Sequence, residues 1–330
     1  MDAASPASTL RLQSKGEPRK RTIGKRLAHL TVVILGVSFL TFLLMYISPG
    51  DPAQKKLTAQ GVAVSQEVLE ATRQEMGLDR PFLTQYGDWL GSALRGDLGV
   101  SYKDGLPVSG KLAGAMGRTF VLALTSLALA LLVSLPLAVW TAVRRGGIAD
   151  HAVRFFSFIG NSLPNFLLSV LLMYFFCIRL KLLPVIANGS VRGLLLPCLA
   201  LTIPLCSRFT RQFRAELLEQ LGQEYVLGAR TRGVRWRDTL LHDVLRNAAP
   251  AMVTITALSI GTLLGGSVVI ETIFSWPGLG KLAMDAISDR DYPVIQGFVL
   301  FTATVYVAVN LLSDLCCGWV DPRVREEARP

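Results

Sequence analysis

The sequence predicts an all-α polytopic membrane protein with six transmembrane helices. Of its 330 residues, 51% are hydrophobic and 18% are charged, whereas a soluble domain carries about 25% charged residues. The mean hydropathy is +0.43. The apolar residues gather in six runs, and the longer ones reach the roughly 20 residues that a helix needs to cross a bilayer. These runs are Leu27–Ile47, Phe120–Val143, Phe155–Ile178, Leu194–Ser207, Ala248–Ile270 and Val294–Val320.

The N-terminal segment 1–26 is polar and basic and has no periodic pattern, so we expect a cytosolic tail. The run that follows, 27–47, is longer than the roughly 7–15 apolar residues of a signal peptide, and no small-residue cleavage site follows it. We therefore expect a first transmembrane helix that is retained.

The lysines and arginines predict the orientation. With the N-terminus in the cytosol, 21 of the 34 basic residues lie in cytosolic segments, and eight more lie in the outer loop 48–118. That loop exceeds the roughly 60 residues over which the positive-inside rule holds. The sequence thus predicts both termini in the cytosol, including a tail at 321–330. The formal net charge of +10 reflects this topology, and the basic residues can attract anionic lipid headgroups. A nucleic-acid partner is therefore not needed to explain the charge.

The outer loop 48–118 is too long for a simple connector. Its residues Val68, Leu69, Thr72 and Met76 fall at helical spacing. We expect two or three short helices that form an extracytoplasmic cap, or an element that packs at the membrane interface.

The segment 119–320 is the expected transmembrane core, and one polar stretch, 209–249, interrupts it on the cytosolic side. The fourth run is short and contains Pro197 and Pro204, so we expect it to be kinked and to continue into the polar stretch. Within the stretch, EYVLGARTRG has an acid at its start, Arg residues near its end and Gly233 to close it, which predicts a short helix. From the residues alone, this helix could simply be a solvated rim.

The third outer segment begins with Trp276, Pro277 and Gly278, which predict a tight turn at the membrane surface followed by a short amphipathic helix. Asp291, with Asp289, is expected to face a partner or lipid headgroups.

Four stretches carry a resemblance to a known family. They are PGDP after the first run, GLDRPFLTQYGDWLGSALRGDLG in the outer loop, EYVLGARTRG in the cytosolic stretch, and ETIFSWPGLGKLAMDAISDRDYP before the sixth run. Together they resemble the inner-membrane permeases of ABC importers in the dipeptide, oligopeptide and nickel class, over nearly the whole chain after Arg26.

The resemblance implies the fold of type I ABC importer permeases, in a bacterial inner membrane, with a coupling helix in the cytosolic loop that sits in a groove of an ATPase. It points to Glu224, Tyr225, Ala229, Arg230 and Gly233 as the coupling residues. One departure is that Tyr225 and Val226 stand where the broader family has two alanines.

The implied partners are a second homologous permease in a heterodimer, two ATPase subunits and an extracytoplasmic solute-binding protein. ATP and magnesium would be bound by the ATPase, and this chain would bind no cofactor and catalyse no reaction. Peptides, nickel and metal chelates all remain open as substrates.

Catalytic signals are weak. The run GLPVSGKL has the glycine and lysine spacing of a phosphate-binding loop but lacks its Ser or Thr. The three histidines are scattered, and the cysteines lie in or beside apolar runs, so we expect no metal site. A membrane-embedded enzyme is therefore disfavoured.

Polar or small residues within the runs are candidates for the pathway or for helix packing. They are Asn161, Asn165, Gly261, Gly265, Ser267, Asn310 and Asp314. An ion-coupled secondary transporter is the alternative function, but it usually has internal repeats and ionisable groups at the membrane midplane, and the sequence shows neither.

Overall fold

A computed structural model describes residues 19–59 and 64–320, and most of the two expected tails lies outside these ranges. The described chain is built of helices, with one isolated bridge between Val100 and Pro107. The helices are α1 (Arg19–Ile47), α2 (Pro52–Ala59), α3 (Gln66–Glu75), α4 (Phe82–Leu94), α5 (Val108–Val143), α6 (Ile148–Ser162), α7 (Asn165–Met173), η1 (Tyr174–Arg179), α8 (Val191–Leu221), α9 (Glu224–Thr231), α10 (Trp236–Asp238), η2 (Thr239–Val244), α11 (Leu245–Ile273), α12 (Leu279–Asp289) and α13 (Tyr292–Val320).

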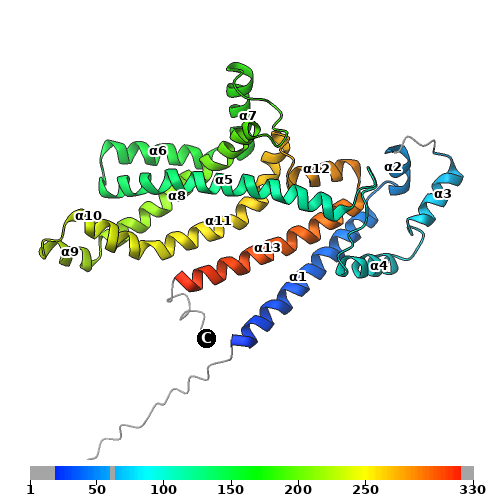
Figure 1. The fold of residues 1–330 in the computed structure, drawn as a ribbon, viewed down its shortest axis with the longest axis horizontal. Helices are drawn as coiled ribbons and strands as arrows, with labels where there is room; N and C mark the ends of the chain where they lie inside the picture. The colour runs from blue at the N-terminus through cyan, green and yellow to red at the C-terminus, as the bar shows by residue number, and fades with distance from the viewer. Residues whose placement is uncertain (1–18, 60–63, 321–330) are drawn as a thin grey trace, which may run out of the picture.

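The molecule is elongated, and its long helices run between two differently built ends (Figure 1). At one end lie the short helices α9 and α10. At the other end lie α2, α3 and α4, which together with their connecting residues we call the cap. The short helix α12 lies on the cap side of the long helices, while α7 projects sideways from the bundle (Figure 1).

The expected class, an all-α membrane protein, is confirmed. Four helices in the described ranges are long and apolar enough to cross a membrane, and two bent pairs raise the number to six if each pair is one span. The first pair joins α1 to α2 with a bend of 74°. Two or three short helices were expected in the outer loop, and three are present as α2, α3 and α4.

The third apolar run, Phe155–Ile178, was expected as one of six spans, and the structure divides it between two helices. Helices α6 and α7 meet at a bend of 100°. Leu163 at the bend is extended, with φ −74° and ψ 128°. Pro164 follows it, and a proline disfavours the helical conformation of the residue before it. The break is therefore a local consequence of the sequence.

Helix α8 runs without a break from Val191 to Leu221, with Pro197 and Pro204 inside it. The fourth apolar run thus continues into the polar stretch, as expected. Two other helices pass the expected boundaries: α1 begins at Arg19, within the expected tail, and α5 begins at Val108, within the expected outer loop.

The main core lies between α5, α8 and α11. Small buried residues of α5, such as Ala130 and Ala138, let α8 approach closely. Further along α8, the rings of Phe209 and Phe213 stack with centroids 5.1 Å apart and are almost fully buried. A second, smaller core joins the start of α5 to α12 and the start of α13. The first core therefore reaches α9, and the second supports the cap end.

Candidate functional site

Helix α9 confirms the short helix expected in the polar stretch. It begins at Glu224, whose carboxylate lies at the positive end of the helix dipole, and its last turn carries Arg230. Gly233 follows in the left-handed conformation with φ 75°. Its amide donates to the carbonyl of Arg230 at 3.0 Å, so the glycine closes the helix as the sequence predicts.

The two faces of α9 have opposite environments. Val226 and Ala229 are only 3% and 2% exposed and pack within this chain. Glu224, Leu227 and Arg230, at a spacing of three residues, are exposed, and Leu227 reaches 66%. The side chain of Ala229 is therefore turned into this chain, whereas those of Glu224 and Leu227 lie on the free face.

Two further contacts hold α9 in place. The hydroxyl of Tyr225 donates to Gln220 at the end of α8, at 3.2 Å. The guanidinium of Arg230 lies over the ring of Trp236, 4.6 Å from its centroid, which adds a cation–π attraction. A cavity of about 450 Å³ beside Arg230 and Trp236 also reaches Arg145 at the end of α5. The helix is thus a firmly seated element with one free face.

A buried ion pair, which sequence reasoning missed, ties α6 to α8. Asp150 is 1% exposed, and its carboxylate accepts hydrogen bonds from Arg214 at 2.8 Å and from the amide of Gly146 at 3.0 Å. The two residues lie far apart in the sequence, Arg214 on the expected continuation of the fourth apolar run, and only the packing of α6 on α8 brings them together.

At the opposite end, an aromatic cluster attaches the cap to α1. Phe42 of α1 packs edge-on against Phe82 and Tyr86 of α4, with both pairs of centroids 5.5 Å apart. Ser38 of α1 shares a hydrogen bond of 3.0 Å with the hydroxyl of Tyr86. Such aromatic pairs contribute about 0.5–1.5 kcal/mol each beyond their buried area. The cap therefore rests on the end of α1.

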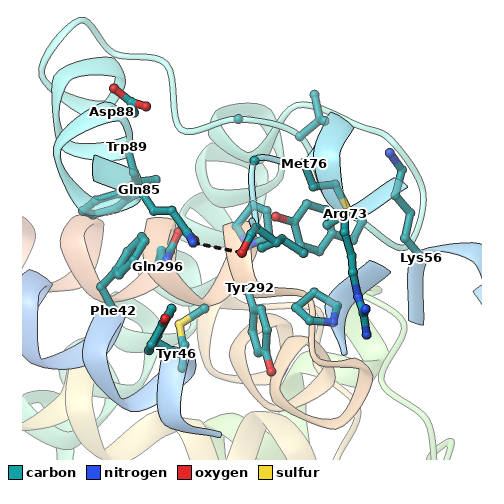
Figure 2. Close-up of a pocket in the computed structure, with 18 of the residues that line it drawn as sticks. Phe42, Tyr46, Lys56, Arg73, Met76, Gln85, Asp88, Trp89, Tyr292 and Gln296 are labelled. Atoms are coloured by element: carbon teal, nitrogen blue, oxygen red, sulfur yellow. Dashed lines mark hydrogen bonds between the residues drawn. The ribbon is translucent and has the colours of Figure 1, made fainter. Parts of the chain in front are cut away.

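A cavity of about 1170 Å³ lies between the cap and the start of α13 (Figure 2). Phe42 and Trp89 line one side, and Lys56 and Arg73 line the other, as Figure 2 shows. The cations already have partners, since Arg73 pairs with Asp51 at 2.6 Å and Lys56 lies 3.7 Å from a carboxylate of α3. The cavity is therefore open, and carboxylates neutralise these two cations on its wall.

The turn at Trp276 exists, but it is buried rather than exposed at a surface. Trp276 is 3% exposed, and its indole nitrogen donates to the carbonyl of Arg118 at 3.1 Å. Gly278 closes the turn with its amide on the Trp276 carbonyl at 2.7 Å. The expected amphipathic helix follows as α12. Since the amide of Ala187, in the loop before α8, also donates to the carbonyl of Phe274 at 2.9 Å, the turn joins several segments.

Asp291 was expected to face a partner or headgroups, and the structure contradicts this. The residue is 3% exposed. Its carboxylate accepts a hydrogen bond from the hydroxyl of Ser101 and one of 2.9 Å from the amide of Tyr102. The partner of this carboxylate is therefore the chain's own outer loop. Its neighbour Asp289 is more exposed and pairs with Lys103 at 2.6 Å.

The candidate pathway residues do not converge on one place. Asn161 and Asn165 are exposed on either side of the α6–α7 bend. On α11, Gly261 is buried, whereas Gly265 is exposed, and a side chain built on it would meet no atom within 4 Å. Gly265 thus makes no tight helix contact within this chain. Ser267 is buried on the same helix. Asn310 and Asp314 belong to α13, but their side chains lie outside the described part.

The phosphate-binding pattern in the outer loop has a structural use. Gly105 takes φ 69° before α5 begins, and Lys111 of that pattern pairs with Asp104 at 2.6 Å. Within residues 19–59 and 64–320, no group of three or more potential metal ligands gathers.

Comparison with known proteins gives consistent matches over most of the chain. The family model described as "Binding-protein-dependent transport system inner membrane component" matches residues 134–326. The model of the corresponding N-terminal component matches residues 20–123.

Three relatives are similar over almost their full length. The chain is 37% identical to a metal-staphylopine import system permease protein of Staphylococcus aureus, covering 92% of this chain and 98% of the relative. It is 34% identical to the dipeptide transport system permease protein of Escherichia coli, with the same coverage. A nickel import system permease protein of Staphylococcus aureus is 35% identical and is covered over 90% of its length.

A solved structure shares the fold. A chain of the methionine ABC transporter MetNI, in an inward-facing conformation, superposes with a TM-score of 0.54 at 21% identity, covering 64% of this chain and 96% of that one.

Proposed function

We propose that this chain, which belongs to the family of binding-protein-dependent transport system inner membrane components, couples solute movement to a separate ATPase through helix α9. As a permease of ABC importers, the chain supplies part of a transmembrane passage in the bacterial inner membrane. The observation that carries the coupling proposal is the free face of α9, with Glu224, Leu227 and Arg230 exposed on a helix that its other face anchors.

The contacts of α9 would transmit a displacement of its free face to the rest of the chain. Val226 and Ala229 pack into the chain, and the hydroxyl of Tyr225 bonds the end of α8. A partner that moves the free face must therefore also move α8, since a packed helix shifts as a rigid body. Helix α8 runs from the α9 end to the foot of α7 (Figure 1) and packs along α5, α6 and α11, so the displacement would reach these helices.

The partners in this proposal are two ATPase subunits at the α9 end, a second and homologous permease, and an extracytoplasmic solute-binding protein at the cap end. ATP and magnesium belong to the ATPase. The α9 end would lie in the cytosol, in agreement with the basic residues near it. Among the pathway candidates, exposed Gly265 has open space in front of it that a second permease could occupy.

The solute is proposed as a peptide or a metal complex. The relatives are named for dipeptide, nickel and metal-staphylopine transport, and a glutathione permease of Pectobacterium atrosepticum is 37% identical as well. In the proposed cycle, the passage opens alternately to the cap side and to the α9 side as the ATPases close and open.

Purification of the tagged chain from gently solubilised membranes tests the proposal. An ATPase and a second permease should be recovered in stoichiometric amounts. Leu227→Glu should lose the ATPase, because it places a charge in the free face, whereas Leu94→Glu, at an 80% exposed position of the cap, should retain it. Recovery of the chain alone, with uptake that needs no ATP, would instead establish an ion-coupled transporter.

Labelling of introduced cysteines tests the orientation. In a background without the native cysteines, a cysteine in place of Leu94 should react with an impermeant reagent in intact cells. One in place of Leu227 should react only after the membrane is permeabilised. The reverse pattern would overturn the assignment of the α9 end to the cytosol.

A further inference from the structure

Three consecutive residues at the corner between α12 and α13 each contact a different point of the chain before α5. Asp289 pairs with Lys103 at 2.6 Å. The guanidinium of Arg290 donates to the carbonyl of Pro49, directly after α1. Asp291 accepts from Ser101 and from the next amide. We call this set of contacts the outer latch; its members are Pro49, Ser101, Lys103, Asp289, Arg290 and Asp291.

The backbone at the latch is specialised for these contacts. Arg290 has φ 55°, in the left-handed region that costs a non-glycine residue about 1–2 kcal/mol. A side chain built on Gly50, whose φ is 120°, would overlap the guanidinium of Arg290. Arg290 therefore keeps an unfavourable backbone conformation, and Gly50 leaves space for its guanidinium. Both features favour the contact with Pro49 at this corner.

The burial of Asp291 makes the latch costly to open. Its carboxylate is 3% exposed and is paired with two donors. Opening would leave the buried carboxylate and the amide of Tyr102 without these bonds unless water entered. The latch is therefore expected to stay closed while the elements on either side move.

Elsewhere, the cap and α13 are poorly joined. The cavity of about 1170 Å³ separates α3 and α4 from the start of α13 (Figure 2). Among the described residues, the buried indole nitrogen of Trp89 and the buried hydroxyl of Tyr292 lack hydrogen-bond partners. The latch therefore supplies polar contacts beside a region where these two buried donors make none.

On its other side, the latch leads into the long helices. Helix α13 starts immediately after Asp291, and the amide of Gly280 in α12 donates to Glu271 of α11 at 2.7 Å. A displacement of the corner would therefore reach both α11 and α13.

We propose that the outer latch makes the cap and the α12–α13 corner one moving unit, with Asp291 as its positioning residue, so that a partner docking on the cap displaces α11 and α13. This inference rests on the proposed function for the existence of that partner. The mechanical unity of the latch does not depend on it.

Hydrogen–deuterium exchange of the full chain in lipid nanodiscs tests that unity. Asp291→Ala should raise exchange at residues 99–104, and also through the cap helices α2 to α4, by about tenfold or more, because two buried hydrogen bonds are lost. Helices α8 and α9 should not change. Asp285→Ala is the matched control, since it removes an exposed ion pair with Lys281 on the same α12 and should leave the cap unaffected.

Two further variants keep the test decisive. Asp291→Asn retains an oxygen that can accept from the Tyr102 amide and should restore most of the protection. If Asp291→Ala fails to fold, Ser101→Ala removes one of the two bonds to Asp291 and should give a smaller increase over the same regions. Faster exchange confined to 99–104, with the cap as protected as in the control, would overturn the proposal.

A functional readout separates this inference from the proposed function. If the complex with the ATPase is recovered, Ser101→Ala should keep its basal ATP hydrolysis and lose at least half of the stimulation by the extracytoplasmic binding protein. Full stimulation would show that docking is not transmitted through the latch. If no complex forms, the proposed function fails, while the exchange experiment still decides whether the latch is one unit.

Discussion

The carboxylate of Glu271 accepts a hydrogen bond of 2.8 Å from the hydroxyl of Thr119, although the two residues are 152 positions apart. Glu271 is completely buried, near the end of α11, and also accepts from the amide of Gly280 at 2.7 Å. One carboxylate thus joins α5, α11 and α12. Because its donors come from a side chain and from the first turn of a helix, its position fixes how the three helices meet.

Glu271→Ala should destabilise the protein strongly. The substitution leaves the Thr119 hydroxyl and the Gly280 amide without their acceptor, at a cost of about 1–3 kcal/mol for each group. Thr119→Ala removes the bond to Glu271 and the one that the hydroxyl accepts from the amide of Leu279 at 2.8 Å. It leaves Glu271 with the amides of Gly280 and Lys281 as donors, so it should cost less. Thermal unfolding in detergent, followed by fluorescence-detected gel filtration, measures which of the two variants is less stable. A Glu271→Ala variant as stable as Thr119→Ala would show that the carboxylate is not the junction of the three helices.

Gly280→Ala should also destabilise the cap end. A methyl group on Gly280 would overlap the backbone of Val268 and lie 2.9 Å from a carboxylate oxygen of Glu271. Overpacking of this kind typically costs about 1–3 kcal/mol. The same thermal measurement should show no loss for Gly265→Ala, since a side chain there meets open space. An equal loss of thermal stability in Gly280→Ala and Gly265→Ala would contradict the close packing of α12 on α11.

Gly233→Pro should abolish uptake while leaving membrane insertion intact. Proline cannot adopt φ 75° and has no amide to donate to the Arg230 carbonyl. The end of α9 would therefore change shape at the proposed ATPase contact. Uptake by cells that express the whole transporter is compared with the amount of the chain in the membrane. The control is Gly228→Ala, where an added methyl makes only ordinary contact, 3.5 Å from Arg232. Normal uptake by Gly233→Pro would refute the coupling role of α9.

The phenol of Tyr102 should resist ionisation. Burial, followed by the nearby carboxylate of Asp291 and by Tyr292, raises the pKa of Tyr102 from 10.0 to about 12. The folded state thus holds its proton more tightly than the unfolded state does, so the contribution of Tyr102 to stability falls as pH rises from about 10 to about 12. Above both values the loss is complete.

Alkaline titration of tyrosinate absorbance, as the difference between the wild type and Tyr102→Phe, measures this pKa. The difference should appear near pH 12, and Asp291→Asn should move it lower, because a negative charge beside the phenol is removed. A difference curve centred at pH 10 in the wild type would mean that the loop at Tyr102 is open to water.

Local signals in the sequence determined the class and many elements. Long uncharged runs predicted a helical membrane protein, and the acid–arginine–glycine order predicted α9 from Glu224 to its cap at Gly233. The motifs also identified the family. These features depend on hydrophobicity, capping and backbone conformation, which residues close in sequence decide among themselves. Even the break at Pro164 follows from a local rule that the apolar composition of the run concealed.

Only the tertiary structure decided which polar residues are partners. Asp291 stands in a charged turn and was expected to be exposed, but it is buried against Ser101. Asp150 lies on another helix from Arg214, and nothing in the spacing of the sequence joins them. The faces of α9 were likewise settled by packing, which turned Ala229 inward. Burying a charge costs several kcal/mol unless donors compensate for the lost water, and distant segments of the chain bring those donors, which no local pattern encodes.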